Sequence, residues 1–540
     1  MALNEAPILM AGDPSKGPAS FTRFVVPFAY EPELLAGPDS AGPHYREAST
    51  PDEWRKRYFT QETRKVLYDR ARWLTLTDAD GGWRNFTVRC GGRDLPVRLS
   101  PPALVLFEWP RHADRRARPE LDPLQTGLLV LEAWFPNEVP QDAKKPVWDL
   151  ESLLQFNELF RYRAMPYEAH PQRVAGERSR WQTTYQEHVE EHLRGLRASL
   201  GKQELDPYLG RWAWLLQFPV SLDGSTYRFM PPDALEEANR DRWLPYADDR
   251  AFVWTCALVE GGADGLAVQR KPAEELGAWI RLLNVDQPGA SWTETMTPTA
   301  FEGAWVAGRT YKRWEQFGTL YGFNWHSGAM LDAPRQEPPT WRHFQEMYFD
   351  QTLLLLYLRV TTFRFSQRLT AVTEDARDGG RRLRDVFFEL RQSFTDFTNL
   401  YQFPLLSNQE QGIEMYSKQR PNMDVDELFN EVQREIESSH ELLEMEEDRQ
   451  QTKAALALNT VATVALAMGL AFSFLGMSII VGKPEPNGVL DRADGPWRLF
   501  AWVLSGSAAF FLLLTGLVWW RALARLFTRV ARRLSGVEDA

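Results

Sequence analysis

The sequence predicts an α+β or α/β domain, followed by long helices and a two-helix transmembrane hairpin at the end of the chain. Two observations predict the hairpin: no charged side chain lies between Lys453 and Lys483, and none lies between Arg498 and Arg521. A third observation predicts the domain, because strand-like and helix-like segments alternate over residues 21–342. The length of 540 residues is enough for two or three domains of ordinary size.

The composition restricts the compartment and the partners that we expect for this chain. The formal net charge is −11, which argues against a nucleic-acid partner, because nucleic-acid-binding proteins are usually basic. Cys90 and Cys256 are the only cysteines, so we expect neither a disulfide framework nor a cysteine-based zinc site. The first residues lack the basic and apolar regions of a signal peptide, so we expect the large N-terminal body to stay in the cytoplasm.

The first two predicted regions differ in composition. Residues 1–20 are rich in Gly, Pro and Ala and are predicted to be a flexible N-terminus. The domain of residues 21–342 follows, and it contains β-branched or aromatic runs bounded by Gly, Pro or charged residues, as strands are. These predicted strands are residues 21–30, 103–109, 127–135 and 251–260. Residues 148–162 and 178–200 have the apolar spacing of helices.

Residues 343–453 lack strand-like runs and are predicted to form a region of long helices. The predicted helices are residues 344–373, 381–401 and 424–453. On the second helix, one face carries the apolar residues Leu383, Val386, Phe387, Leu390, Phe394 and Phe397.

The third of these helices has a heptad-like seam and a start signal. The seam residues are Val425, Phe429, Val432, Ile436 and Leu443. Asp424 with Glu427 resembles a capping box. No charged residue, Gly or Pro separates this helix from the first apolar run, so we expect one continuous helix over residues 423–481.

The two apolar runs are long enough to cross a bilayer, which takes about 20 residues of helix. We expect transmembrane helices at residues 454–481 and 499–520, a short external loop at residues 482–498 and a basic tail at residues 521–540. The tail carries Arg521, Arg525, Arg529, Arg532 and Arg533, which is a positive-inside signal. We therefore expect an integral protein of the cell or inner membrane with both termini cytoplasmic.

One face of the first predicted span carries polar side chains. At 100° per residue, six of its residues lie within about 80° of one another. They are Asn459, Thr463, Leu466, Leu470, Ser473 and Met477. Polar side chains in hydrocarbon usually face a bundle interior or a water path, so we interpret this face as pore-lining, with the two leucines as a constriction. The alternative is helix–helix packing, which small residues favour.

Two charged clusters are candidate binding sites. Glu446, Glu447 and Asp448 precede the first span and offer the hard oxygen ligands that Mg²⁺ or Ca²⁺ prefers. The alternative is a solvated helix face. A basic cluster is a candidate site for a small nucleotide-like anion, although surface loops often carry such clusters. It consists of Arg111, Arg115, Arg116 and Arg118.

This layout resembles the CorA-like magnesium channel family, which has a cytoplasmic α/β domain, a long stalk helix continuous with the first span, and a second span. The Gly-Met-Asn signature of the family is matched by Gly476, Met477 and Ser478. The resemblance implies a homopentamer whose first spans line a pore, with Mg²⁺ or another divalent cation as substrate or regulator. Ser478 offers a hydroxyl in place of the amide that helps to hold a hydrated cation, so the ion preference does not carry over.

The leading hypothesis is a homo-oligomeric CorA-like cation channel or transporter, gated by its cytoplasmic domain and without enzymatic activity. A second hypothesis is a ligand-activated effector that combines a signal receptor with a membrane-permeabilising pore. A third is a membrane-anchored scaffold without a pore.

Overall fold

The computed structural model divides the chain into two compact units, Met1–Ile436 and Glu437–Ala540. The described residues are 19–30, 45–48, 51–76, 83–90, 93–100, 103–107, 125–136, 148–161, 220–221, 227–228, 243–245, 250–259, 272–273, 276–286, 300–332, 340–377, 382–476, 502, 505–506 and 509.

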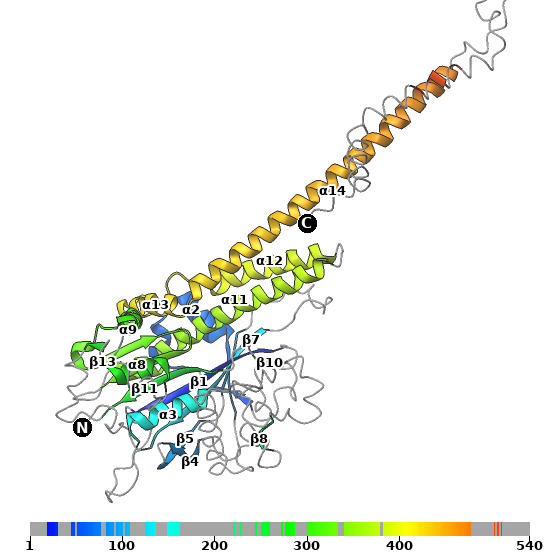
Figure 1. Cartoon of the computed structure of the whole chain (residues 1–540). Coiled ribbons are helices and arrows are strands. Elements are labelled where there is room, and N and C mark those ends of the chain that lie inside the picture. Colours follow the sequence, from blue (N-terminus) through cyan, green and yellow to red (C-terminus); the bar gives the residue numbers. More distant parts are fainter. Residues whose placement is uncertain are drawn as a thin grey trace, which may run out of the picture. The chain divides into compact units, whose positions relative to one another are not determined.

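A mixed β-sheet forms the centre of the first unit (Figure 1). Its strand order is β12-β13-β14-β11-β1-β7-β6-β3-β2; β10 also pairs with β1, and the β4–β5 ribbon joins β7 through β5. Of the described strand pairs in this sheet, only β11 and β14 run parallel. β8 and β9 form a separate two-stranded sheet. The strands are β1 (Phe21–Tyr30), β2 (Tyr45–Glu47), β3 (Arg72–Leu76), β4 (Arg84–Cys90), β5 (Arg93–Leu99), β6 (Ala103–Leu106), β7 (Gln125–Trp134), β8 (Val220–Ser221), β9 (Tyr227–Arg228), β10 (Trp243–Pro245), β11 (Phe252–Leu258), β12 (Thr310–Tyr311), β13 (Thr319–Phe323) and β14 (Ser327–Asp332).

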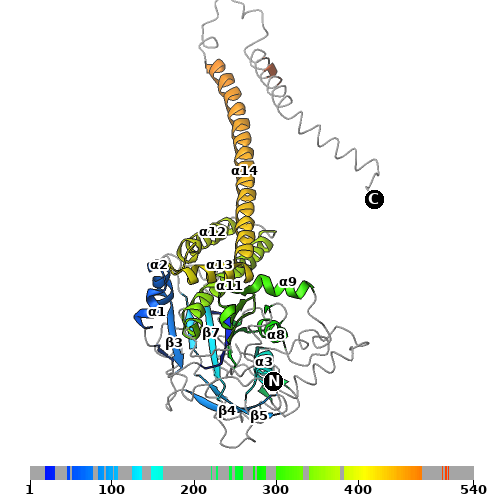
Figure 2. The ribbon, with the colours of Figure 1, turned by 90° about the vertical axis from the view of Figure 1, so that its left-hand side faces the viewer.

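Helices cover both faces of the sheet (Figure 1). On one face lie α3 (Leu150–Arg161) and α8 (Gly277–Asn284), and α9 (Ala300–Arg309) precedes β12. The other face carries α10 (Thr340–Gln345) and α11 (Met347–Arg377). The remaining helices of this unit gather beside α11 (Figure 2). They are α1 (Glu53–Arg57), α2 (Gln61–Arg64), the π-helical turn η3 (Lys65–Arg70), α12 (Arg382–Tyr401) and α13 (Glu410–Asn422).

Alternate side chains of β1 pack against the two helical layers, because successive residues of a strand point to opposite faces. Phe24 packs against Phe156 of α3, with ring centroids 5.9 Å apart. Phe21 contacts Phe344 of α10 on the other side, at 6.4 Å. Arg23, on the same side as Phe21, lies 4.3 Å from the ring centroid of Phe349 in α11. The central strand is therefore buried on both faces.

Trp254 of β11 joins the sheet to α10. Its indole stacks on Phe344 with centroids 4.1 Å apart, and its Nε1–H donates to the Phe344 carbonyl at 3.2 Å. Gly328 of β14 is its register partner in the parallel pair. A Cβ at Gly328 would lie 2.3 Å from the Trp254 ring, so only glycine allows the indole to lie over β14.

Most of the predicted strands and helices of the first unit are present. The runs starting at residues 21, 103, 127 and 251 form β1, β6, β7 and β11, and the helix predicted at residues 148–162 is α3. The buried face of α12 includes Phe387, Leu390, Phe394 and Phe397, as predicted. The helix predicted at residues 178–200 lies outside the described residues. The sequence did not predict α13, because Gly412 and Pro421 lie within it and both disfavour helix interiors.

The long third helix is α14 (Val425–Gly476), and residues 477–481 of the predicted range lie outside the described residues. Its seam residues Val425, Phe429, Val432 and Ile436 are buried, and Phe429 stacks on Phe394 of α12 at 5.3 Å. The capping prediction is wrong, because Asp424 has φ 54° rather than the extended backbone of an N-cap residue.

The predicted two-helix transmembrane hairpin is wrong. Within the described parts of the chain, none of the helices combines the length and the apolar character needed to cross a bilayer. The charge-free residues 454–476 form the end of α14; they are rich in alanine and include Asn459 and Thr463, side chains that gain little on transfer to hydrocarbon. Residues 477–481 and most of residues 499–520 lie outside the described residues. The predicted integral-membrane localisation and the predicted transmembrane topology are therefore also wrong.

We predict that both cysteine thiols are unreactive in the native protein. Cys90 and Cys256 are fully buried. Burial raises the pKa of Cys90 to about 12 and raises the pKa of Cys256 well above its ordinary value, so the reactive thiolate is scarce at pH 8. Ellman's reagent should detect no fast-reacting thiol in the native chain and two after unfolding in guanidinium chloride. Rapid modification of either thiol in the native chain would contradict the packing of β4 or β11.

Candidate functional site

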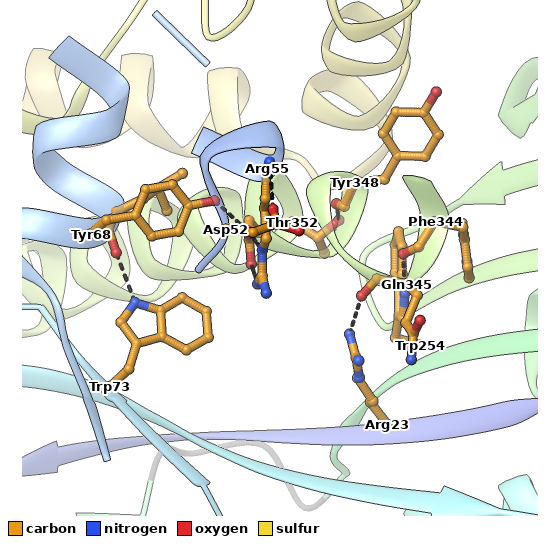
Figure 3. Close-up of polar contacts among 12 residues, drawn as sticks. Arg23, Asp52, Arg55, Tyr68, Trp73, Trp254, Phe344, Gln345, Tyr348 and Thr352 are labelled. Carbon is orange, nitrogen blue, oxygen red and sulfur yellow. Dashed lines mark hydrogen bonds and ion pairs between the residues drawn. The ribbon is translucent and has the colours of Figure 1, made fainter. Parts of the chain in front are cut away.

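A buried ion pair connects the first helices of the chain to α11. The Nε–H of Arg55 in α1 donates to Oδ2 of Asp350 at 2.6 Å, and an Nη2–H donates to Oδ1 of the same carboxylate. The Tyr68 hydroxyl also donates to Oδ2 of Asp350. Figure 3 shows Arg55 and Tyr68 pointing toward α11 from α1 and η3. Asp350 is fully buried in the first turn of α11, where the helix dipole favours a negative charge.

The electrostatics of this pair agree with its geometry. Burial acts to lower the pKa of Arg55, but the Asp350 carboxylate outweighs it and the pKa of Arg55 is raised. Burial, with the Asp350 charge, raises the pKa of Tyr68, so its hydroxyl stays protonated and can donate. Both groups therefore donate hydrogen bonds to the buried Asp350 carboxylate.

Further contacts fix the segment of residues 52–70, here called the N-terminal strap, against two other parts of the unit. Arg342 donates to Asp52 at 2.7 Å, and its guanidinium lies 4.4 Å from the Trp54 ring centroid. The amide of Thr60 donates to the Leu406 carbonyl at 2.9 Å, in the loop before α13. The strap thus contacts α10, α11 and the connection between α12 and α13.

A second network holds α13 beside β12. Glu414 of α13 accepts hydrogen bonds from the Tyr311 hydroxyl and from Nη1 of Arg313, the latter at 2.6 Å. Arg313 also donates to Glu410 at 3.2 Å. The Tyr311 hydrogen bond, followed by Arg313, holds the pKa of Glu414 below its ordinary value. This carboxylate therefore remains ionised at neutral pH.

The start of α14 is set by the helices around it. A buried amide network joins α11 to α13: Gln351 donates to Gln419 at 2.7 Å, and Gln419 donates to Thr352 at 3.0 Å. Arg420 of α13 donates to Asp426 in the first turn of α14. Between them, Asp424 has φ 54°, a left-handed conformation that Asp tolerates better than most residues. We call residues 419–426 the α13–α14 corner.

The end of α8 is a strained polar turn. Val285 has φ 57°, which for a β-branched residue is a backbone outlier, and such outliers cluster at functional sites. The preceding carbonyl, of Asn284, accepts from Arg161 at 3.3 Å and from His326 Nε2 at 3.1 Å. Burial raises the pKa of Asp286, and the Arg161 charge opposes this shift. This turn therefore brings together the Arg161 guanidinium, the His326 ring and the Asp286 carboxylate.

The structure places the predicted pore-lining residues on the C-terminal part of α14. Asn459, Thr463 and Leu466 are exposed there, and the Thr463 hydroxyl donates to the Asn459 carbonyl at 2.7 Å. Leu470 and Ser473 lie in α14, but their side chains are not among those described. In the predicted signature, Gly476 is the last described residue of α14, and Met477 and Ser478 lie outside the described residues.

The predicted metal ligands are described only in part. Asp448 is exposed on α14, and the side chains of Glu446 and Glu447 are outside the described set. Among the residues that the structure describes, no group of three His, Cys, Asp or Glu side chains could hold a metal ion. The basic cluster Arg111, Arg115, Arg116 and Arg118 also lies outside the described residues. Binding of a divalent cation remains a prediction.

Comparisons with protein-family models, with curated proteins and with solved structures found no match to this chain. The resemblance to the CorA-like family is thus untested and rests on the sequence features alone.

The sequence did not indicate the two buried networks. Arg55 and Asp350 are 295 positions apart, and nothing near either residue marks it as paired. Asp350 does carry a weak signal, because it is a charged residue beside the apolar run of Leu353–Leu356 in a helix. A carboxylate at such a place needs a partner, but which residue is the partner depends on the tertiary fold.

We predict that the Arg55–Asp350 pair shows strong thermodynamic coupling. Arg55→Met leaves a buried carboxylate without its cation and should lower the free energy of unfolding by about 3–5 kcal/mol. Adding Asp350→Leu should recover at least about 2 kcal/mol, because an apolar pair replaces the unpaired charge. Guanidinium denaturation of the full chain measures both values. The exposed neighbour Arg57 provides the control, since Arg57→Met should change stability by under about 0.5 kcal/mol. Equal losses in the single and double variants would contradict the buried pair.

We also predict that Glu414 contributes to stability in a pH-dependent manner. Its pKa is depressed in the folded chain, so its contribution is present above the unfolded value of 4.5 and is lost as the pH falls through the folded value. Glu414→Gln should therefore be less stable than wild type at pH 7, with the difference shrinking below about pH 4.5. Thermal denaturation between pH 3 and pH 7 measures this. Glu410→Gln, at a side chain that is 77% exposed, should have little effect. A difference that does not vary with pH would show that Glu414 acts without its charge.

Proposed function

We propose that the chain is a homo-oligomeric regulatory protein, in which the unit Met1–Ile436 receives a signal and α14 carries the contacts between copies. The observation that supports this most strongly is the apolar surface of α14 within the second unit. Five large apolar side chains there are between 55% and 69% exposed, namely Leu456, Leu458, Val461, Leu466 and Met468.

These side chains lie around the whole helix rather than along one stripe. At 100° per residue, no sector wider than about 120° lacks one of them. A helix that is apolar all round is normally covered on all sides. A two-stranded coiled coil would cover only one seam, so this distribution favours an assembly of more than two helices.

Other copies of the same chain are the partners that fit this surface. Residues 454–476 carry no charge, so identical helices side by side place uncharged residues at the same level without like-charge repulsion. The hydroxyls of Thr460 and Thr463 donate to carbonyls within the helix at 2.8 and 2.7 Å, so their protons need no partner at a packed contact. Full burial of a Leu, Val or Met side chain contributes about 1.5–3 kcal/mol, enough over five side chains to offset much of the cost of association.

The cation-channel hypothesis required two membrane spans and is not carried further. What remains of the channel and effector hypotheses is a receiving unit joined to a helix that associates with its copies.

We predict that charged substitutions on α14 abolish self-association. The full-length wild-type chain should form a complex of more than two copies in light scattering coupled to gel filtration. Leu458→Lys combined with Val461→Lys should give a monomer, because lysine side chains cannot be packed between apolar neighbours without losing their hydration. Glu441→Lys, at an exposed residue of the same helix, should leave the assembly unchanged. A monomeric wild-type chain, or one that floats with lipid vesicles instead of self-associating, would refute the proposal.

A further inference from the structure

Three cationic side chains gather where α9 meets α13, close to the α13–α14 corner. Arg309 ends α9, Lys312 follows β12, and Lys418 lies on α13 one turn after Glu414. Glu414 and Asn422, one turn before and one turn after Lys418, contact the Tyr311 hydroxyl and the Gly308 carbonyl, the latter at 3.5 Å from Asn422 Nδ2.

The charges of this cluster act on one another. Burial lowers the pKa of Lys418, and the nearby cations Lys312 and Arg309 lower it further. Among the described residues, no carboxylate pairs with Lys418 or forms a hydrogen bond with Arg309. Arg313, which follows β12, pairs with Glu410 and Glu414. The protein thus balances the positive charge at Arg313 and leaves an excess at Lys418.

Arg309 is held in place by aromatic side chains. Its guanidinium lies 4.1 Å from the ring centroid of Trp305 and 5.7 Å from that of Trp325. The two indoles meet edge to face at 6.4 Å, and Trp325 is 38% exposed. The Nε of Arg309 is buried and has no hydrogen-bond acceptor among the described residues. A guanidinium fixed by stacking loses little conformational entropy when it binds an anion.

We infer that Arg309 and Lys418 bind the phosphate group of a small-molecule ligand. A phosphate offers several acceptor oxygens and a charge near −2, which suits a planar guanidinium together with an ammonium group. It also removes the repulsion between these two cations. Free phosphate compounds and nucleotides share this chemistry, and in a nucleotide the base would lie next to the exposed face of Trp325.

The site lies next to the corner from which α14 starts. Asp424, the left-handed residue of that corner, interacts electrostatically with Arg309. A bound phosphate competes with Asp424 for Arg309 and weakens their attraction. The phosphate compound is then the signal that the first unit receives, a consequence that rests on the proposed function.

Isothermal titration of the full-length chain with pyrophosphate, ATP and adenosine tests the site. Pyrophosphate and ATP should bind, and adenosine should not. Arg309→Gln and Lys418→Gln should each weaken pyrophosphate binding by about tenfold or more, since each removes a charged hydrogen-bond donor. Lys418→Arg should retain most of the affinity. Arg434→Gln, an equal loss of charge at an exposed position on α14, should leave binding unchanged.

The outcomes separate this inference from the proposed function. Binding of adenosine as tight as that of ATP, equal binding by wild type and both Gln variants, or no binding of either phosphate compound at millimolar concentration would overturn the phosphate site. None of these results affects the oligomeric state, which light scattering reports on its own. Binding by a chain that is monomeric would instead support the site and refute the assembly through α14.

Discussion

The buried ion pair of Arg55 and Asp350 imposes the constraint on which the helical layer of the first unit depends. This carboxylate lies in the first turn of α11, which crosses the sheet with its apolar residues buried. A buried carboxylate without a cation would cost several kcal/mol, so α11 can occupy this position only while Arg55 accompanies it. Arg55 belongs to the N-terminal strap, and the strap also contacts the loop before α13. One ion pair therefore links the position of α11 to that of the strap and, through it, to α13.

The position of α11 also affects where α14 starts, through contacts with α13. The residues after Asp350, Gln351 and Thr352, form the buried amide network with Gln419 of α13. These polar groups have each other as partners, and a shift of one helix would leave a buried amide unsatisfied. Arg420 then joins α13 to Asp426 in the first turn of α14. Discrete contacts of this kind change by breaking and re-forming rather than by gradual deformation.

Local patterns in the sequence predicted the elements whose burial follows a simple period. β1 and β11 are apolar on both faces, and α12 has an apolar face at helical spacing, so their positions were recognisable. α13 was missed because Gly412 and Pro421 disfavour a helix locally, whereas Gln419 and Met415 make it favourable through tertiary packing. The Arg55–Asp350 pair could not be predicted, because partners 295 positions apart leave no local signal. The transmembrane prediction was wrong, because none of the described helices is long and apolar enough to cross a bilayer.

The two turns of α13 that face residues 309–313 differ in their charge balance. At Glu414, a carboxylate with a depressed pKa meets Arg313 and the Tyr311 hydroxyl, so its contacts are satisfied within the protein. At Lys418, one turn further, the neighbouring charges are cations. Lys418 is only partly buried, so a carboxylate could lie near it without disturbing the packing. If both turns served only to attach α13, such a carboxylate would stabilise the folded chain. The excess positive charge lowers stability, and it lies next to the only corner through which the described part of the first unit continues into α14. A cost in stability at that position supports the inferred site for an anionic ligand.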